Sequence, residues 1–438
     1  MTLERVENIA SSSVLLGFSG KIVESRLTPV DDRVDGANHV LKHQVGPHYA
    51  AKDAMEAVAD LTVQDAIIPM QIDKDFQAYL GDVFNHRPNV HGVDVTRFDT
   101  QTAEEILKSY NESGPVVHYG MWTMPKLPDY LSLIPADDQK RANAKSMLSK
   151  VFTDEAVPPQ LILQDPRKKG EGKTIFEATQ VDLDEIRNGY DKLWLKAGDW
   201  GLGGEGVVPG KDLKDLLDFY RQLVDLGVDN AEIILEQHVP GEGGSFCVIK
   251  RVDGKVQFSH ITKQLSDTEG KRLGNIIFEI DKARPQMKVL VERTGNTLAE
   301  SDLPPGFYTF DTLDTKDGRS LLDDPANRKT GTTPTAYQRM YLVNNMGLSK
   351  RDTVTGMQRL YLNPNTHFSE VIKAFQSARL TEWKNGRIIT FRQFLNAYGR
   401  ASFHLALTTN NAEQLPEVEE EVVHALKVAD IDNSPKPF

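Results

Sequence analysis

Three things are scarce in this chain of 438 residues: cysteine, an excess of positive charge, and long apolar runs. Cys247 is the only cysteine, which excludes an internal disulfide and a metal site built from several cysteines. Asp and Glu outnumber Lys and Arg by 63 to 51, so the net charge is −12. We therefore expect no general electrostatic binding to nucleic acid or to an anionic membrane. A basic pocket for one phosphorylated small molecule is compatible with this charge.

No apolar run approaches the roughly 18 residues that a membrane helix needs. The first ten residues, MTLERVENIA, include acids and lack the uninterrupted apolar core of a secretory leader. The sequence thus predicts a protein of the cytoplasm.

Changes in pattern along the chain predict three regions, within the two to four domains that this length allows. Residues 1–141 alternate short apolar runs with helix-like segments, which favours an α/β domain on a partly parallel sheet. Residues 142–340 are rich in strand patterns with crossing helices, and residues 341–438 look mostly helical. The predicted fold class is mixed α/β (α+β) with a helical C-terminal region.

Several elements can be placed from local patterns. Apolar residues at helical spacing predict a helix from Leu213 to Val224, and Gly227 supplies its stop. The run AEIILEQHV predicts a buried strand. A hairpin is indicated by SFCVIKRVDGKVQFSHI, with Asp253-Gly254 at its turn. In the first region the strand-like runs are SVLLGF, DAIIPM, VDVTRF and PVVHYG.

The stretch KAGDWGLGGEGVV, residues 196–208, places five glycines between the strand-like run KLWLK and the predicted helix. Glycine lets a loop approach a ligand closely, because it has no Cβ and adopts left-handed backbone angles at little cost. The loop lacks the Gly-Lys-Ser/Thr ending of a Walker A motif and is not a Rossmann fingerprint. Taken alone it fits a flexible surface loop as well as a phosphate-binding loop.

The order of the surrounding motifs resembles that of the ATP-grasp superfamily. The resemblance rests on NAKSMLSKVFTDEAVPP, LWLKAGDWGLGGEGV, ILEQHVPGE and FDTLDTKDGRSLLDDPANR, and covers about residues 142–335. Within the superfamily, RKTGTTP and IVESRL are most similar to the peptide ligases related to the pheganomycin enzyme. That resemblance implies a pre-ATP-grasp domain at residues 1–141, an ATP-grasp core at 142–340 and a helical extension at 341–438.

The resemblance implies a site for ATP. Lys145 and Lys196 would neutralise phosphate charge from two separate elements, and Glu242 would take the ribose hydroxyls, one residue earlier than is usual in the family. The backbone of the glycine loop would close over the phosphates, and a hinge after the buried strand would hold the base. The loop glycines are Gly201, Gly203, Gly204 and Gly206, and the hinge residues are Glu236, Gln237, His238 and Val239. The alternative for both lysines is a solvated surface charge.

The resemblance also implies Mg²⁺, which takes hard oxygen ligands. Asp311 and Asp324 are 13 residues apart in the sequence, which is the separation of the two metal-binding carboxylates in the related D-alanine ligases. The family's metal-binding asparagine has no counterpart in register, because Ala326 stands there and Asn327 follows one position later. Either a bulge at Pro325 brings Asn327 to the metal, or the metal is held without it. Arg328 would brace the γ-phosphate or the acyl phosphate, and GTTP, residues 331–334, would shape the acceptor side.

These assignments predict an ATP-dependent carboxylate–amine ligase that works through an acyl phosphate and releases ADP and phosphate. Lys196 and Arg328 are its predicted catalytic residues, and ATP and Mg²⁺ its cofactors. Its substrates would be a small carboxylate and an amine, such as amino acids or peptides, and a homodimer is conceivable by analogy with relatives. A nucleotide-binding protein that has lost catalysis, and a kinase, are the alternatives. His238 and His260 fit structural roles as side chains, and Cys247 fits a small buried apolar residue.

Overall fold

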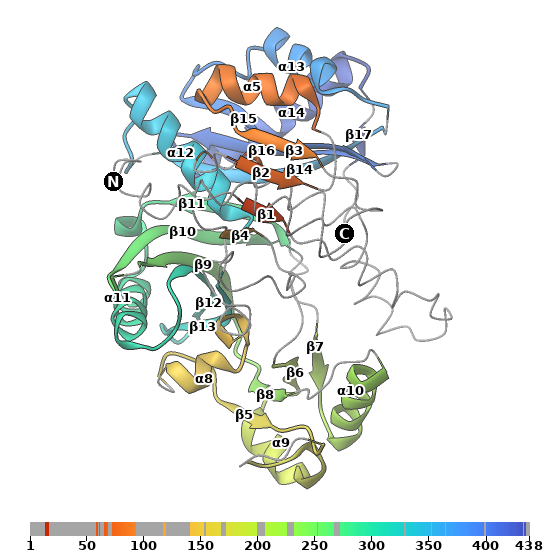
Figure 1. Ribbon diagram of the computed structural model, residues 1–438, viewed down its shortest axis with the longest axis vertical. Helices are drawn as coiled ribbons and strands as arrows, with labels where there is room; N and C mark the ends of the chain where they lie inside the picture. Colours follow the sequence, from red (N-terminus) through yellow and green to blue (C-terminus); the bar gives the residue numbers. More distant parts are fainter. Residues whose placement is uncertain are drawn as a thin grey trace.

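The computed structural model describes residues 14–16, 58–59, 61, 65–68, 72–92, 117–119, 141–152, 155–167, 172–198, 206–225, 232–251, 253–266, 272–327, 330–351, 353–363, 365–397, 400–431 and 433–434. Within these ranges the strands form three sheets, and helices pack around them (Figure 1). No helix in the described ranges has the length and apolar content to cross a membrane.

The first sheet belongs to the N-terminal region, and all of its paired strands are parallel. Its strands, in spatial order, are β3 (Asn89–Gly92), β2 (Asp65–Ile68), β1 (Val14–Leu16) and β4 (Val117–Tyr119). The parallel sheet predicted from the apolar runs is therefore present. The run VDVTRF, which was also expected to be a strand, lies outside the described residues.

The second sheet is small and antiparallel. Its strands, in spatial order, are β5 (Gln160–Leu163), β8 (Ile233–Gln237), β6 (Leu193–Ala197) and β7 (Val207–Gly210). One face buries Leu193, Leu195 and Leu235 against α9 (Gln180–Arg187) and α10 (Leu213–Asp225). Strand β8 is buried throughout and α10 begins at Leu213, so the buried strand and the helix predicted here are confirmed.

The third sheet is the largest. Its strands, in spatial order, are β13 (Ser320–Asn327), β12 (Gly306–Thr315), β9 (Gly241–Lys250), β10 (Val256–Ser266), β11 (Arg272–Phe278), β14 (Val354–Leu362), β16 (Arg400–Thr409) and β15 (Arg387–Ala397), with β17 (Asn433–Ser434) beside β14. Strands β9 and β10 form the predicted hairpin, and Gly254 at its turn has φ +80°.

The apolar run Phe246–Ile249 of strand β9 is buried on both faces of the sheet. Phe246 and Val248 face one cluster, which α8 (Met147–Val151) and α11 (Pro285–Glu300) cover. Cys247 and Ile249 face the opposite side, where Tyr337 of α12 (Thr332–Met346) packs. A strand that is covered on both faces has no polar alternation. Short 3₁₀ turns lie at Ile175–Glu177, Ile280–Lys282 and Ala412–Gln414.

The C-terminal region differs from its prediction. Residues 341–438 are not mainly helical, because β14, β15 and β16 extend the large sheet as three long antiparallel strands. The helices α13 (Phe368–Ser377) and α14 (Leu415–Val428) pack on these strands. Helix α12 runs through residue 340, so the boundary predicted there falls inside a helix.

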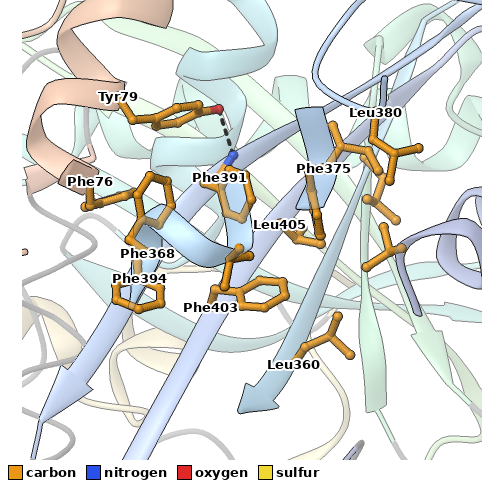
Figure 2. Packing of buried hydrophobic residues seen from close by; sticks show 14 of the residues in the cluster. Phe76, Tyr79, Leu360, Phe368, Phe375, Leu380, Phe391, Phe394, Phe403 and Leu405 are labelled. Carbon is orange, nitrogen blue, oxygen red and sulfur yellow. Dashed lines mark hydrogen bonds between the residues drawn. The ribbon is translucent and has the colours of Figure 1, made fainter. Parts of the chain in front are cut away.

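The core of this region includes a helix from far earlier in the chain. Helix α5 (Lys74–Phe84) lies beside α13 (Figure 1), and Phe76 packs edge-on against Phe368 with ring centroids 5.2 Å apart. The backbone N–H of Phe391 donates a hydrogen bond of 3.0 Å to the Tyr79 hydroxyl (Figure 2). Burial raises the pKa of Tyr79, so this phenol stays neutral. The N-terminal and C-terminal regions thus share one core.

Replacing Tyr79 by Phe keeps the ring and leaves the buried Phe391 N–H without its acceptor. We expect the free energy of unfolding, measured in urea, to fall by about 1–3 kcal/mol. Tyr190→Phe is the control, because Tyr190 is 38% exposed, and it should change stability by less than about 0.5 kcal/mol. Equal stabilities of the two variants would show that this bond does not hold α5 to the sheet.

Candidate nucleotide and metal site

Lys196 lies at the centre of the small sheet, on the face opposite its apolar cluster. Leu195 and Ala197 point into that cluster, so strand alternation turns Lys196 the other way. Glu236 of β8 stands opposite Trp194, diagonally from Lys196 on the same face. The Lys196 Nζ lies 2.9 Å from Glu236 Oε1, and both side chains are 3% exposed. A lysine at this position is a buried charge, contrary to the surface alternative.

Two further carboxylates reach Lys196 from the large sheet. Asp323 Oδ1 lies 2.6 Å and Asp324 Oδ1 3.3 Å from its Nζ. Both belong to β13, so the ion pairs join the edge strand of the large sheet to the middle of the small one. The sequence analysis missed Asp323, because adjacent residues of a regular strand point to opposite faces.

A β-bulge explains why both aspartates face the same lysine. Phe310 pairs with Pro325 and Thr312 with Leu322, so Asp323 and Asp324 together stand opposite Asp311. One extra residue on β13 redirects the side chains at that point. The bulge lies at these two aspartates and not at Pro325, where the sequence analysis considered one, because Pro325, Ala326 and Asn327 pair with β12 in regular register. The acidic pair directly before a proline is the signal that marks it.

Lys145 comes to the same place from the segment before α8. Its backbone N–H donates to Gly198 O at 2.7 Å, and the Gly198 N–H donates to Glu232 O at 2.7 Å. These bonds tie the segment to the end of β6. Lys145 Nζ then lies 3.3 Å from Asp324 Oδ2, at a side-chain exposure of 8%. Two lysines from separate elements therefore share Asp324.

The charges in this cluster perturb one another strongly. Burial raises the pKa of Glu236 to about 8, against the lowering effect of Lys196. Burial also lowers the pKa of Lys196, but Asp323, Asp324 and Glu236 together outweigh it and hold that pKa well above its ordinary value. For Asp324, Lys145 and Lys196 outweigh burial and keep the pKa below its ordinary value. Asp324, which pairs with both lysines, is thus ionised at neutral pH.

The predicted metal ligands sit around the bulge. Asn327 is 1% exposed, and neither Oδ1 nor Nδ2 of its amide has a hydrogen-bond partner among the described residues. Its backbone N–H donates to Asn143 Oδ1 at 2.8 Å, which connects β13 to the Lys145 segment. Asp311 is exposed and faces the bulge from β12. In the described ranges no three His, Cys, Asp or Glu side chains form a ready metal cluster.

These donors suit Mg²⁺, because it takes one or two protein carboxylates and completes its shell with other oxygens. Asp324 offers an ionised carboxylate, and Asn327 offers a buried amide oxygen that lacks a described partner. An unsatisfied buried amide costs free energy, which a ligand would recover. Asp311, Asp324 and Asn327 therefore remain the predicted metal ligands. Asp323 lies next to Asp324 at the bulge.

The predicted hinge begins at the last two residues of β8, Glu236 and Gln237, and continues through His238 and Val239. The Gln237 N–H donates to Pro159 O at 2.9 Å, and Val239 is 7% exposed. The His238 ring lies edge-on against Trp194 and Tyr190, with centroids 5.6 and 5.9 Å away. These contacts give the His238 side chain a packing role, whereas its backbone stays the predicted base contact.

Glu242, the predicted ribose ligand, is 55% exposed at its side chain and lies at the start of β9. Its Oε2 lies 2.9 Å from Lys263 Nζ and 3.3 Å from an Arg284 nitrogen. Of the loop glycines, Gly206 has φ +65°, a backbone angle that glycine adopts without strain. Gly201, Gly203, Gly204 and Arg328 lie outside the described residues.

His260 is a structural histidine, as its sequence context indicated. It is 4% exposed, and its Nε2 lies 3.0 Å from the Thr332 Oγ1 at the start of α12. Burial lowers its pKa to about 4, so the ring is neutral at physiological pH. This contact fixes the GTTP segment to the large sheet.

The raised pKa of Glu236 predicts a pH dependence of stability. Between about pH 4.5 and 8 the folded protein holds a proton on Glu236 that the unfolded chain has lost, so stability falls as pH rises through this window. Glu236→Gln removes this effect. We expect the free energy of unfolding of the variant, relative to the natural protein, to increase from about pH 5 to about pH 8 and then to level off.

Urea unfolding at several pH values measures this difference. Glu300→Gln is the control, because Glu300 is an exposed carboxylate at the end of α11. A difference between Glu236→Gln and the natural protein that stays constant across the window would mean that Glu236 is ionised in the folded protein throughout.

No family model matches the chain, and no curated protein matches it in sequence. Solved structures, however, are similar over most of its length. An N5-carboxyaminoimidazole ribonucleotide synthetase in complex with ADP has a TM-score of 0.54 at 15% identity, over 87% of this chain and 95% of that one. The synthetase of the same name from Thermus thermophilus has a TM-score of 0.51 at 15% identity, over 95% of this chain and 98% of that one.

A third similar structure is the biotin carboxylase domain of the Hydrogenobacter thermophilus 2-oxoglutarate carboxylase, solved with MgADP and bicarbonate. Its TM-score is 0.52 at 14% identity, over 88% of each chain. Likeness at such low identity shows the fold and leaves the reaction open. The mixed α/β chain therefore has the fold of the ATP-grasp enzymes, which confirms the fold expected from its motifs.

Proposed function

We propose that this protein is an ATP-dependent ligase that joins a carboxylate to an amine through an acyl phosphate. The observation that supports this most is the meeting of Lys145 and Lys196 with the carboxylates of β13 between two sheets. Two buried ammonium groups next to metal-type donors suit a nucleotide phosphate chain bound with Mg²⁺. The similar structures that contain ADP support the choice of nucleotide.

The proposed reaction has two steps. A substrate carboxylate oxygen attacks the γ-phosphorus of ATP, the bond to the β-phosphate oxygen breaks, and ADP leaves. The amine nitrogen then attacks the acyl carbon, and the bond between that carbon and the phosphate oxygen breaks. Phosphate leaves, and the product is an amide. The amine proton passes to phosphate or solvent. No nucleophile of the protein is consumed.

The chain's own residues would act by position and charge. Lys196 and Lys145 would hold the phosphate oxygens and offset the charge that shifts to them. Asp311, Asp324 and Asn327 would hold Mg²⁺, which neutralises phosphate charge when bound. The glycine loop of residues 201–206 would donate backbone N–H groups over the phosphates, and Arg328 would brace the group in transfer.

A second candidate is bicarbonate as the acid. Two of the similar structures are named as carboxyaminoimidazole ribonucleotide synthetases, and the carboxylase domain was solved with bicarbonate. The first step would be unchanged, with a bicarbonate oxygen as the attacking group, and the product would be a carbamate. The two candidates differ only in the acid.

A substrate screen separates these candidates. The protein is incubated with MgATP and pooled amino acids, with and without bicarbonate, while ADP and phosphate are measured and products are identified by mass spectrometry. Amino-acid-dependent ADP and phosphate with an amide product supports the ligase, and strict bicarbonate dependence supports the second candidate. A phosphorylated product that accumulates would indicate a kinase. Stoichiometric AMP and pyrophosphate would exclude the proposed chemistry.

Lys196→Met should weaken ADP binding in the presence of Mg²⁺ by roughly 10- to 150-fold, because one charge-assisted phosphate contact is worth about 1.5–3 kcal/mol. Calorimetric titration with ADP measures it. Lys214→Met is the matched control, since Lys214 is 80% exposed on α10 and pairs with Asp218. If both variants bind ADP as the natural protein does, the phosphates bind elsewhere.

A further inference from the structure

Three carboxyl groups already surround the Lys196 ammonium. The Nζ lies 2.9 Å from Glu236 Oε1, 2.6 Å from Asp323 Oδ1 and 3.3 Å from Asp324 Oδ1. An ammonium group has three hydrogens and no more. A phosphate oxygen can therefore bind Lys196 only if one of these three carboxylates gives up its place.

The sheet topology indicates which carboxylate moves. Glu236 stands on β8, hydrogen-bonded to the strand of Lys196, so its pair with Lys196 lies within one sheet. Asp323 and Asp324 stand on β13 of the other sheet. If a phosphate chain bound between the two sheets, it would separate Lys196 from β13, and the pair of Lys196 with Glu236 would remain.

The two aspartates differ in their partners. Asp324 also lies 3.3 Å from Lys145 Nζ, so it keeps a cation if it leaves Lys196. The only ion pair that the described part of the chain gives to Asp323 is the one with Lys196, and it is the shortest of the three at 2.6 Å. Asp323 is thus the direct competitor of a phosphate oxygen for Lys196.

The charge count adds a second requirement. Two lysines face the two aspartates of β13 in this cluster. When phosphates replace Asp323 on Lys196, that carboxylate stands uncompensated beside phosphate oxygens of the same sign, at a side-chain exposure of 30%. A divalent cation between carboxylates and phosphates removes this repulsion.

On the basis of the proposed function, we propose that Asp323 is a positioning residue that occupies the phosphate place on Lys196 until Mg²⁺ arrives with the nucleotide. It thereby couples nucleotide binding to the metal and keeps metal-free nucleotide out of the site. Asp324 and Asn327, in contrast, act on the metal itself. Removing the charge of Asp323 frees a donor of Lys196 and relieves the repulsion, so it favours metal-free nucleotide.

The test measures ADP affinity by calorimetric titration with excess Mg²⁺ or with EDTA, which avoids turnover. The natural protein should bind ADP much more weakly in EDTA. Asp323→Asn should strengthen binding in EDTA by about tenfold and keep most of the affinity with Mg²⁺, so the ratio of the two affinities falls. Asp324→Asn should instead weaken binding with Mg²⁺. Asp317→Asn, in the exposed β12–β13 turn where Asp317 pairs with Arg319, is the matched control and should change neither value.

Three results would overturn the proposal. If Asp323→Asn leaves the affinity in EDTA unchanged, Asp323 does not compete with phosphate. If it lowers the affinity with Mg²⁺ as strongly as Asp324→Asn does, Asp323 is a metal ligand. In either case ADP binding with Mg²⁺ by the natural protein preserves the proposed function. Failure of the natural protein to bind ADP under both conditions would remove the proposed function and this inference together.

Discussion

A buried ammonium ion is stable only where carboxylates surround it, and Lys196 satisfies this condition by drawing partners from two sheets. Its own sheet contributes Glu236 through the neighbouring β8, and the large sheet contributes Asp323 and Asp324. The bulge on β13, the approach of Lys145 and the raised pKa of Glu236 all meet in this one cluster. The contact between the two sheets therefore includes these ion pairs.

Much of this arrangement could be predicted from the sequence. The apolar runs KLWLK and AEIILEQHV indicated the two central strands of the small sheet, and motif order indicated the fold. Lys196 and Asp324 were identified through the resemblance, from the order of the motifs and the separation of Asp324 from Asp311. Asp323 was missed because its direction depends on a bulge, and the bulge depends on pairing with β12, a contact distant from the local sequence pattern.

The C-terminal strands escaped prediction for a related physical reason. In β15, Phe391, Arg392, Gln393 and Phe394 are all buried, and the pairing with β16 shifts register between Phe391 and Gln393. A strand that is covered on both faces and interrupted by a bulge shows neither the period of two nor a plain apolar run. The helices beside it have clear apolar faces, so their pattern dominated. Likewise, nothing local in α5 indicates that Tyr79 accepts a hydrogen bond from Phe391.

The central claim is that Lys145 and Lys196 bind nucleotide phosphates while the donors of β13 hold Mg²⁺. A crystal structure of the protein with MgADP tests it most directly. The account predicts phosphate oxygens within hydrogen-bonding distance of both lysine ammonium groups, a metal ion contacted by Asp324 and Asn327, and Asp323 moved off Lys196. Nucleotide bound elsewhere, with the Lys196–Asp323 pair intact, would contradict it.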